Sequence, residues 1–299
     1  MSLIGLLTTK FRLSKRLTVD FFKQTFGLNI SLGTVSNTEA VVSKSLEPFY
    51  AAVEQTIKSA KIVHVDETSH KEKHKNGWAW VMSTNQATLF ALRRSRGKKI
   101  AKELIGNDFD RTFVTDRYVA YDYLPEQNRQ VCWAHLKRDF TKISERKGKI
   151  GRIGLQLLKY HNKIFHLWKT EPIQRRLHHH KTKQWFRRFQ RKMLYFLEAG
   201  TKCGHKQTQN TCQNLLDIWN ALWTFWFSDV PATNNQAERQ LRPLVISKKL
   251  TFGTQSDRGS RYIERMFTAV MTCQQQGLGL LNLVLSAMED FFNPSAMAI

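Results

Sequence analysis

The sequence predicts an α/β fold with a mixed central sheet, a long helical insertion, and further helices towards both ends of the chain. Short β-branched runs between residues 61 and 133 predict the strands, and two of these runs lead directly into an aspartate. A basic, aromatic-rich stretch with helical spacing follows, from Phe140 to about Trp226. The chain has 299 residues, 41% of them hydrophobic, so it can bury a core in one elaborated domain or two modest ones.

The first part of the chain is predicted to be helical. Apolar residues recur at helical spacing from Leu17 to Phe26, and Gly27 ends that pattern. Ser31 is a suitable N-cap near a second helical stretch, Val35 to Ala60, which we expect to break near Pro48. Helix, short turn and helix form the outline of a helix-turn-helix, but many helical hairpins share that outline. The second helix is not notably basic, which argues against a role in reading the major groove.

Five β-strands are predicted between residues 61 and 133. Each is a short run rich in apolar or β-branched residues, and the second alternates with a period of two. The runs are Lys61–Asp66, Gly77–Thr84, Ala87–Leu92, Arg111–Thr115 and Arg129–Trp133. Polar, turn-like residues at 71–76 separate the first two runs, so the first three strands fit an antiparallel meander. A helix from Lys98 to Ile105, ended by Gly106, is predicted after the third strand.

The rest of the chain is predicted to be mostly helical. Three helices follow the basic, aromatic-rich stretch, in Gln236–Leu241, Tyr262–Gln276 and Leu280–Phe291. Pro243 is expected to disturb the first of them. The segment from Ser247 to Gly259, between the first and second, is predicted to be a basic loop.

The charge of the chain favours a polyanionic partner. Forty-seven lysines and arginines against 24 acids leave a net charge of +23. Nucleic acid is the commonest partner of such a protein. A membrane surface or a ribosome is the alternative, but the chain lacks the small size and low-complexity tails usual in ribosomal proteins. Its four cysteines include no CxxC pair, and no stretch is long and apolar enough for a membrane span, so we expect a cytoplasmic, nucleoid-associated protein with reduced thiols.

Three acids stand out in this order of elements. Asp66 and Asp116 end two predicted strands, and Glu238 lies on a later helix. A ribonuclease-H-like fold has this arrangement. Carboxylates are hard oxygen ligands of the kind that Mg²⁺ prefers, and two such ions about 4 Å apart can activate the attacking oxygen and stabilise the leaving one. Taken singly, an acid at such a position is more often a structural or solvated residue, and only the three together indicate this chemistry.

The distances along the chain divide it into four segments. Asp116 and Glu238 are separated by far more residues than one strand and one helix require, and the excess is the basic helical stretch. The predicted segments are a helical region (1–60), the first part of a catalytic domain (61–139), a helical insertion (140–230), and the end of the catalytic domain with the C-terminal helices (231–299).

Several sequence blocks together resemble the insertion-sequence 66 family of bacterial transposases. The longer blocks are His64-Val-Asp-Glu-Thr68, Thr115-Asp-Arg-Tyr-Val-Ala-Tyr121, Cys132-Trp-Ala-His-Leu-Lys-Arg-Asp139 and Asn234-Asn-Gln-Ala-Glu-Arg-Gln-Leu-Arg-Pro243. Shorter matches are Lys248-Lys249, Gly253-Thr254, Ser256, Arg258-Gly259 and Thr272-Cys-Gln-Gln-Gln-Gly277. Rare blocks that recur in one order over nearly the whole chain make the resemblance specific.

The resemblance implies a DDE transposase whose three acids are Asp66, Asp116 and Glu238. It implies that water first attacks the DNA at the element ends and that the 3′-hydroxyl then attacks target DNA, without a covalent protein–DNA intermediate. The implied cofactor is Mg²⁺ or Mn²⁺, as two ions held by these acids. The implied partners are the transposon ends and the target DNA. We further expect a homo-oligomer on DNA, no membrane partner, and accessory proteins from the same element.

Two departures from the family pattern leave alternatives open. Full-length relatives carry an N-terminal coiled coil and a cysteine-rich, zinc-finger-like module, and this sequence begins after both. A truncated, inactive DNA-binding remnant or regulator of transposition is therefore the alternative function, and a ribonuclease-H-like nuclease such as a junction resolvase is a third. Arg117 also follows Asp116 where a small residue is expected, which places a cation near the predicted metal site.

Eight further residues are candidate DNA contacts on the basis of the resemblance and their charge. They are Trp133, His135, Arg138, Arg239, Arg242, Lys248, Lys249 and Arg258. Trp133 could instead pack in the core, and Arg242 could pair with Glu238 one helical turn away. Glu67 adjoins Asp66 but is expected on the opposite face of its strand, so it is not assigned as a ligand.

Overall fold

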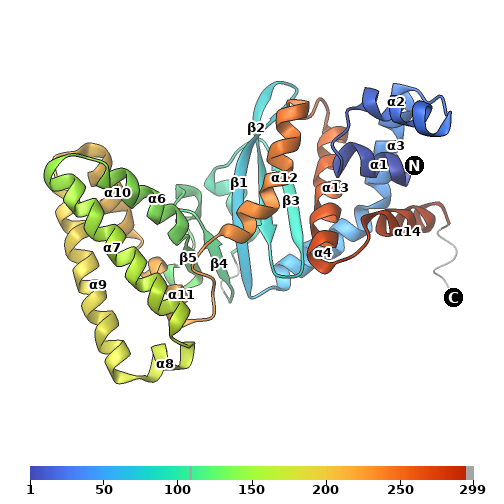
Figure 1. The fold of residues 1–299 in the computed structure, drawn as a ribbon. Coiled ribbons are helices and arrows are strands. Elements are labelled where there is room, and N and C mark those ends of the chain that lie inside the picture. The colour runs from blue at the N-terminus through green and yellow to red at the C-terminus, as the bar shows by residue number, and fades with distance from the viewer. Residues whose placement is uncertain (108–109, 294–299) are drawn as a thin grey trace. The chain divides into compact units, whose positions relative to one another are not determined.

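The computed structural model describes residues 1–107 and 110–293, and the chain divides into two compact units (Figure 1). Unit 1 is formed by Met1–Gly106 together with Gln236–Ile299, and unit 2 by Asn107–Asn235. Unit 2 is therefore inserted between the two halves of unit 1. Each unit has its own hydrophobic core.

Unit 1 begins with a cluster of helices whose ends are set by local capping. The helices are α1 (Ser2–Thr9), α2 (Lys15–Phe26), α3 (Leu32–Ser45) and α4 (Glu47–Ser59). Gly27 adopts a left-handed conformation after α2, and the Ser31 hydroxyl accepts the Thr34 N–H at 3.0 Å to cap α3. Pro48 lies in the first turn of α4, where its missing N–H costs nothing. The helix end at Gly27, the cap at Ser31 and the break near Pro48 are all confirmed, whereas α1 was not predicted.

An antiparallel meander follows, as predicted. Its strands are β1 (Ile62–Glu72), β2 (Lys75–Ser83) and β3 (Thr88–Arg93). The first two strands are longer than predicted, because the polar residues after Asp66 continue the pairing as far as Glu72 opposite Lys75. Lys73 and His74 form the turn with positive φ angles of 50° and 62°, which suit a tight hairpin. Helix α5 (Lys98–Ile105) ends at Gly106 as predicted.

Three later helices complete unit 1. They are α12 (Asn235–Thr251), α13 (Asp257–Gln276) and α14 (Leu280–Phe292). Buried residues of α12 and α13 form one core with Ala79, Val81 and Phe90 of the meander. The prediction of a loop from Ser247 to Gly259 was wrong for most of that segment, because α12 runs through Pro243 to Thr251 and Ser256 caps α13.

Unit 2 contains a parallel pair of strands and a helical body. The strands are β4 (Thr112–Thr115) and β5 (Arg129–Val131). The helices are α6 (Trp133–Ser144), α7 (Gly148–Thr170), α8 (Ile173–His178), α9 (His180–Thr201), α10 (Lys206–Asp217) and α11 (Thr224–Phe227). The predicted fifth strand was too long, because Trp133 already begins α6, with its backbone N–H donated to the Ala232 carbonyl at 3.0 Å.

The observed strands pair both antiparallel, in unit 1, and parallel, in unit 2, so the pairing is mixed as predicted. The basic segment after Phe140 forms helices that bury a large aromatic core, including Trp133, Trp223 and Phe225. In the described part of the chain, no helix combines the length and the apolar character needed to cross a membrane.

Candidate functional site

Asp66 lies on the face of the meander that α12 covers. Its pairing partner across β1 and β2 is Val81, and the side chains of directly opposite residues share one face of a sheet. Val81 is fully buried in the same core as Ala237 and Leu241 of α12. Asp66 is only half-buried, and its Oδ1 accepts the N–H of Glu67 at 2.9 Å.

Helix α12 runs along β1 in the same direction as that strand. At its start, Gln236 Nε2 donates to the Ser83 hydroxyl at 3.2 Å, and Ser83 pairs with His64 at the beginning of β1. Near its end, Lys248 Nζ donates to the Thr68 hydroxyl at 2.9 Å. Asp66 lies between His64 and Thr68, so this strand presents its carboxylate beneath the helix.

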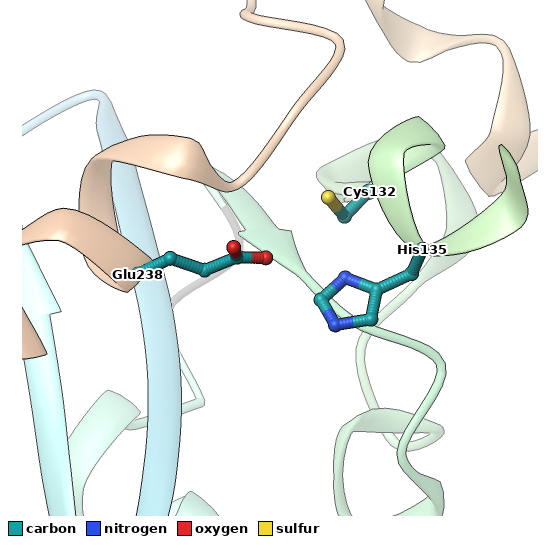
Figure 2. A group of neighbouring side chains, drawn as sticks. All are labelled: Cys132, His135 and Glu238. Atoms are coloured by element: carbon teal, nitrogen blue, oxygen red, sulfur yellow. The ribbon is translucent and has the colours of Figure 1, made fainter. Parts of the chain in front are cut away.

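Glu238 lies in the first turn of α12, two residues after Gln236. Figure 2 shows its side chain leaving the helix. The residue is half-buried, at the border between the buried residues Ala237 and Leu241 and the exposed Arg239. An acid in the first turn is favoured by the helix dipole. Unit 1 therefore carries two of the three predicted acids on the face of its meander that α12 covers, Asp66 on the strand and Glu238 on the helix.

Glu67 faces away from these two acids, as the alternation of a strand predicts. Its carboxylate lies 4.0 Å from the guanidinium of Arg96, and its side chain is almost fully buried. Arg96 in turn stacks over the ring of Trp78, with 4.5 Å between the guanidinium carbon and the ring centroid. Glu67 therefore belongs to a cluster on the opposite face.

Asp116 directly follows β4 in unit 2 and is held by local hydrogen bonds. Its Oδ1 accepts the N–H of Tyr118 at 2.8 Å, and its carbonyl accepts the hydroxyl of Thr115 at 2.9 Å. A hydrogen bond from a backbone N–H to the side chain of the aspartate two residues earlier forms an Asx turn, and this turn orients the carboxylate. Asp116 is half-buried, so part of it faces solvent.

Arg129 of β5 braces the backbone around Asp116 from within the core of unit 2. Arg129 is 1% exposed. The guanidinium donates to the Thr115 hydroxyl at 3.0 Å, to the Asp116 carbonyl at 3.0 Å and to Asp122 Oδ1 at 2.8 Å. Arg129 was not among the predicted site residues, because a single arginine in a predicted strand carries no signal of its long-range partners.

Arg117 turns towards a carboxylate of its own unit. Its guanidinium donates to Asp139 Oδ2 at 2.7 and 3.0 Å and to Asn214 Oδ1 at 2.9 Å. The cation that departs from the family pattern beside Asp116 is thus paired within unit 2, which offsets its charge.

The residues around the start of α6 have distinct environments. Trp133 is fully buried, and its indole N–H donates to the Leu222 carbonyl at 2.7 Å, which agrees with the alternative of a core residue. Cys132, also buried, accepts the N–H of Asn234 at 3.1 Å. His135 is half-buried and Arg138 exposed. Figure 2 shows His135 on the first turn of α6 and Cys132 directly before that helix.

The basic candidates of unit 1 lie on helices rather than in the predicted loop. Arg239, Arg242 and Lys249 are exposed on α12, and Arg258 is exposed on α13. Lys248 is half-buried, and burial together with the neighbouring Lys249 lowers the pKa of its ammonium group.

The predicted acids are therefore divided between the units, with Asp66 and Glu238 in unit 1 and Asp116 in unit 2. Comparison with known proteins adds one match. The sequence profile of a family described as "Transposase IS66 family" matches residues 14–262, which is most of the chain. No curated protein matches the sequence.

Proposed function

Because the chain belongs to the IS66 family of transposases, we propose that it cleaves DNA at the ends of an insertion sequence and joins those ends to target DNA. Family membership implies a DNA-processing enzyme that uses a divalent metal. In this proposal Asp66, Asp116 and Glu238 hold the metal, Mg²⁺ or Mn²⁺, as two ions.

The observation that supports this proposal most is the placement of Asp66 and Glu238 in unit 1. A carboxylate on β1 and a carboxylate in the first turn of α12 occupy one face of the meander. Both are half-buried, whereas the neighbouring acid Glu67 is directed to the opposite face. A ribonuclease-H-like catalytic domain is the proposed fold for this arrangement.

The donor set fits a hard divalent cation. All three residues offer carboxylate oxygens, which Mg²⁺ and Mn²⁺ prefer to nitrogen or sulfur. When bound, the metal supplies charge neutralisation at the phosphate and activation of the attacking oxygen. In this proposal the Asx turn at Asp116 and the contact of Lys248 on α12 with Thr68 on β1 orient the ligands before any DNA binds.

The proposed reaction has two displacements at phosphorus. In the first, a water oxygen bonds to the phosphorus at the element end, the bond to the 3′-oxygen breaks, and that oxygen leaves as a 3′-hydroxyl after gaining a proton. In the second, this 3′-hydroxyl loses its proton and bonds to a target phosphorus, and a target 3′-oxygen leaves. Exposed basic side chains, such as Arg239, Arg242 and Lys249, hold the DNA backbone in this proposal.

The test compares isosteric variants of the three proposed ligands with an isosteric variant of Glu67, the acid next to Asp66. Asp66→Asn, Asp116→Asn and Glu238→Gln are each expected to reduce metal-dependent cleavage and strand transfer of labelled element ends by at least about 100-fold, because each removes a charged ligand. Glu67→Gln is the matched control and keeps activity, since Glu67 faces away. Thermal unfolding of each variant shows whether the fold is intact. Unchanged strand transfer in any folded variant of the three acids would refute its assignment.

The same experiment separates the alternative functions. The net charge of +23 also suits an inactive transposase remnant or a regulator of transposition that binds DNA without cleaving it. Such a protein binds the labelled ends but yields no product with either metal. A junction-resolving nuclease yields nicks without joined strands.

A further inference from the structure

A second feature of unit 1 lies at the far end of α12. A groove of about 870 Å³ opens between the hairpin of β1 and β2 and the segment that links α12 to α13. Its lining includes His70, Lys71, Trp78, Lys248, Lys249 and Phe252. We call it the hairpin groove.

The linker that forms one wall of the hairpin groove is fixed to the end of β1. The N–H of Thr254 donates to the Lys71 carbonyl at 2.9 Å, and the N–H of Lys73 donates to the Thr254 carbonyl at 2.9 Å. Gly253 lies between the end of α12 and Thr254. Its φ is +100°, and a Cβ at this position would collide with the backbone of Lys71. The wall is therefore held rigidly against the hairpin.

Phe252, on this wall, has two features that do not stabilise the fold. Its φ of 58° lies in the left-handed region, which a bulky residue rarely adopts and which favours glycine at the end of a helix. Phe252 is also 78% exposed, more than any of the other large exposed hydrophobic residues in the described chain. Backbone strain that exposes an apolar ring is typical of a binding site.

The groove is basic and carries a polar group without a partner. Lys71 and Lys249 are exposed, Lys248 is held by Thr68 and Ser69, and no acid is among the lining residues that the structure describes. His70 is 5% exposed, and its Nδ1 has no hydrogen-bond partner within the described residues. Burial and Lys248 lower the pKa of His70 to about 4, so its ring is neutral at pH 7.

We propose that the hairpin groove binds an unpaired nucleotide of a DNA strand, with its base stacked on Phe252 and its phosphates at Lys71 and Lys249. This inference rests on the proposed function only in taking DNA as the partner. An aromatic face next to lysines is the combination that holds single strands, because every base has a face to stack and every nucleotide a phosphate.

The test measures binding in EDTA, so that no catalysis is needed. The probe is a short single-stranded oligonucleotide with one 2-aminopurine, whose fluorescence is quenched when the base stacks. Phe252→Ala is expected to weaken binding by about 5- to 150-fold and to remove the quenching. Phe252→Trp retains both. Phe11→Ala is the matched control, because Phe11 is 57% exposed in the same unit but does not line the groove.

The source of the unpaired nucleotide is distinguished by three DNA probes: a single strand, a duplex with an unpaired 3′ extension, and a blunt duplex. Phe252→Ala should affect the first two and leave the third unchanged. Lys249→Ala should weaken the first two as well. These variants keep their fold, since both side chains are exposed, and thermal unfolding checks this.

Equal binding of the single strand by the wild type and Phe252→Ala would overturn the proposal. So would an equal loss in Phe11→Ala, or displacement of the oligonucleotide by poly-glutamate at equal charge concentration, which would assign the groove to acidic peptides. Failure of the proposed function is a separate result, because it shows as absent cleavage in the presence of metal while binding in EDTA is unaffected.

Discussion

At the scale of single residues, long-range partners give each side chain its role. Arg117 and Arg129 both lie near Asp116 in sequence or in space, yet they differ in burial. The side chain of Arg129 is 2% exposed and that of Arg117 is 23% exposed. Arg129 contacts the hydroxyl and carbonyl groups that carry Asp116, whereas Arg117 contacts α6 and α10. We therefore expect the two arginines to matter in different ways.

Replacing Arg129 should both destabilise unit 2 and disturb Asp116. Arg129→Gln removes the donor to the buried Thr115 hydroxyl, to the carbonyl of half-buried Asp116 and to the exposed Asp122 carboxylate, and each buried polar group left without its partner costs about 1 to 3 kcal/mol. Urea unfolding measures the loss of stability. Arg117→Gln is the comparison and should cost about 1 kcal/mol or less, because its pair is partly solvated. A loss of stability as large in Arg117→Gln as in Arg129→Gln would contradict this difference.

At the scale of elements, close backbone approach and capping decide where helices lie. Helices α6 and α7 form a hairpin in which Gly154 faces the backbone of Ile143 and Ser144, and a Cβ on Gly154 would collide with it. A glycine in mid-helix normally costs stability. Here it permits the two helices to approach, so the requirement for glycine comes from packing.

The two helical glycines Gly154 and Gly33 should therefore respond oppositely to alanine. Gly154→Ala forces the helices apart and should destabilise the protein by about 1 to 3 kcal/mol. Gly33 lies exposed on α3, with only the Ser31 hydroxyl nearby, so Gly33→Ala should stabilise the helix by about 0.5 kcal/mol. Thermal unfolding of the two variants gives the signs. A stabilised Gly154→Ala protein would show that α6 and α7 tolerate a wider separation.

At the scale of the whole molecule, the positive net charge governs how the protein binds DNA. The excess of 23 positive charges is spread over helices of both units, including the exposed Arg187 and Arg188 on α9. Such a surface binds phosphates through release of counterions, without regard to base sequence.

Affinity for a blunt duplex should accordingly fall steeply with salt. Between about 50 and 200 mM salt we expect a loss of at least about 1,000-fold if about six phosphates are contacted. Fluorescence anisotropy of a labelled duplex over a salt series measures the slope. An affinity independent of salt would exclude backbone contacts as the main source of binding.

The sequence by itself determined the features that depend on neighbouring residues. Gly27, Ser31 and Gly106 set helix ends through hydrogen bonds or φ angles within a few residues, so their positions were predictable. The alternation of β2 predicted a strand, and the position of Asp116 directly after β4 followed from the local pattern of its own run. The prediction that Asp66 ends its strand was wrong, because β1 continues past it to Glu72. Family membership was predictable too, because it rests on ordered sequence blocks.

Only the tertiary structure decided the features that depend on residues far apart in the chain. The hairpin extends through polar residues because β2 supplies the pairing, and α12 continues through Pro243 because Leu241 and Leu244 are buried in the core of unit 1. The burial of Trp133 depends on Leu222, and the exposure of Phe252 on the bonds that hold Thr254 to β1. Local propensities are worth fractions of a kcal/mol for most residues and about 3 kcal/mol for a proline inside a helix, whereas burying one large side chain is worth about 2 kcal/mol. The two buried leucines of α12 together therefore offset the cost of Pro243.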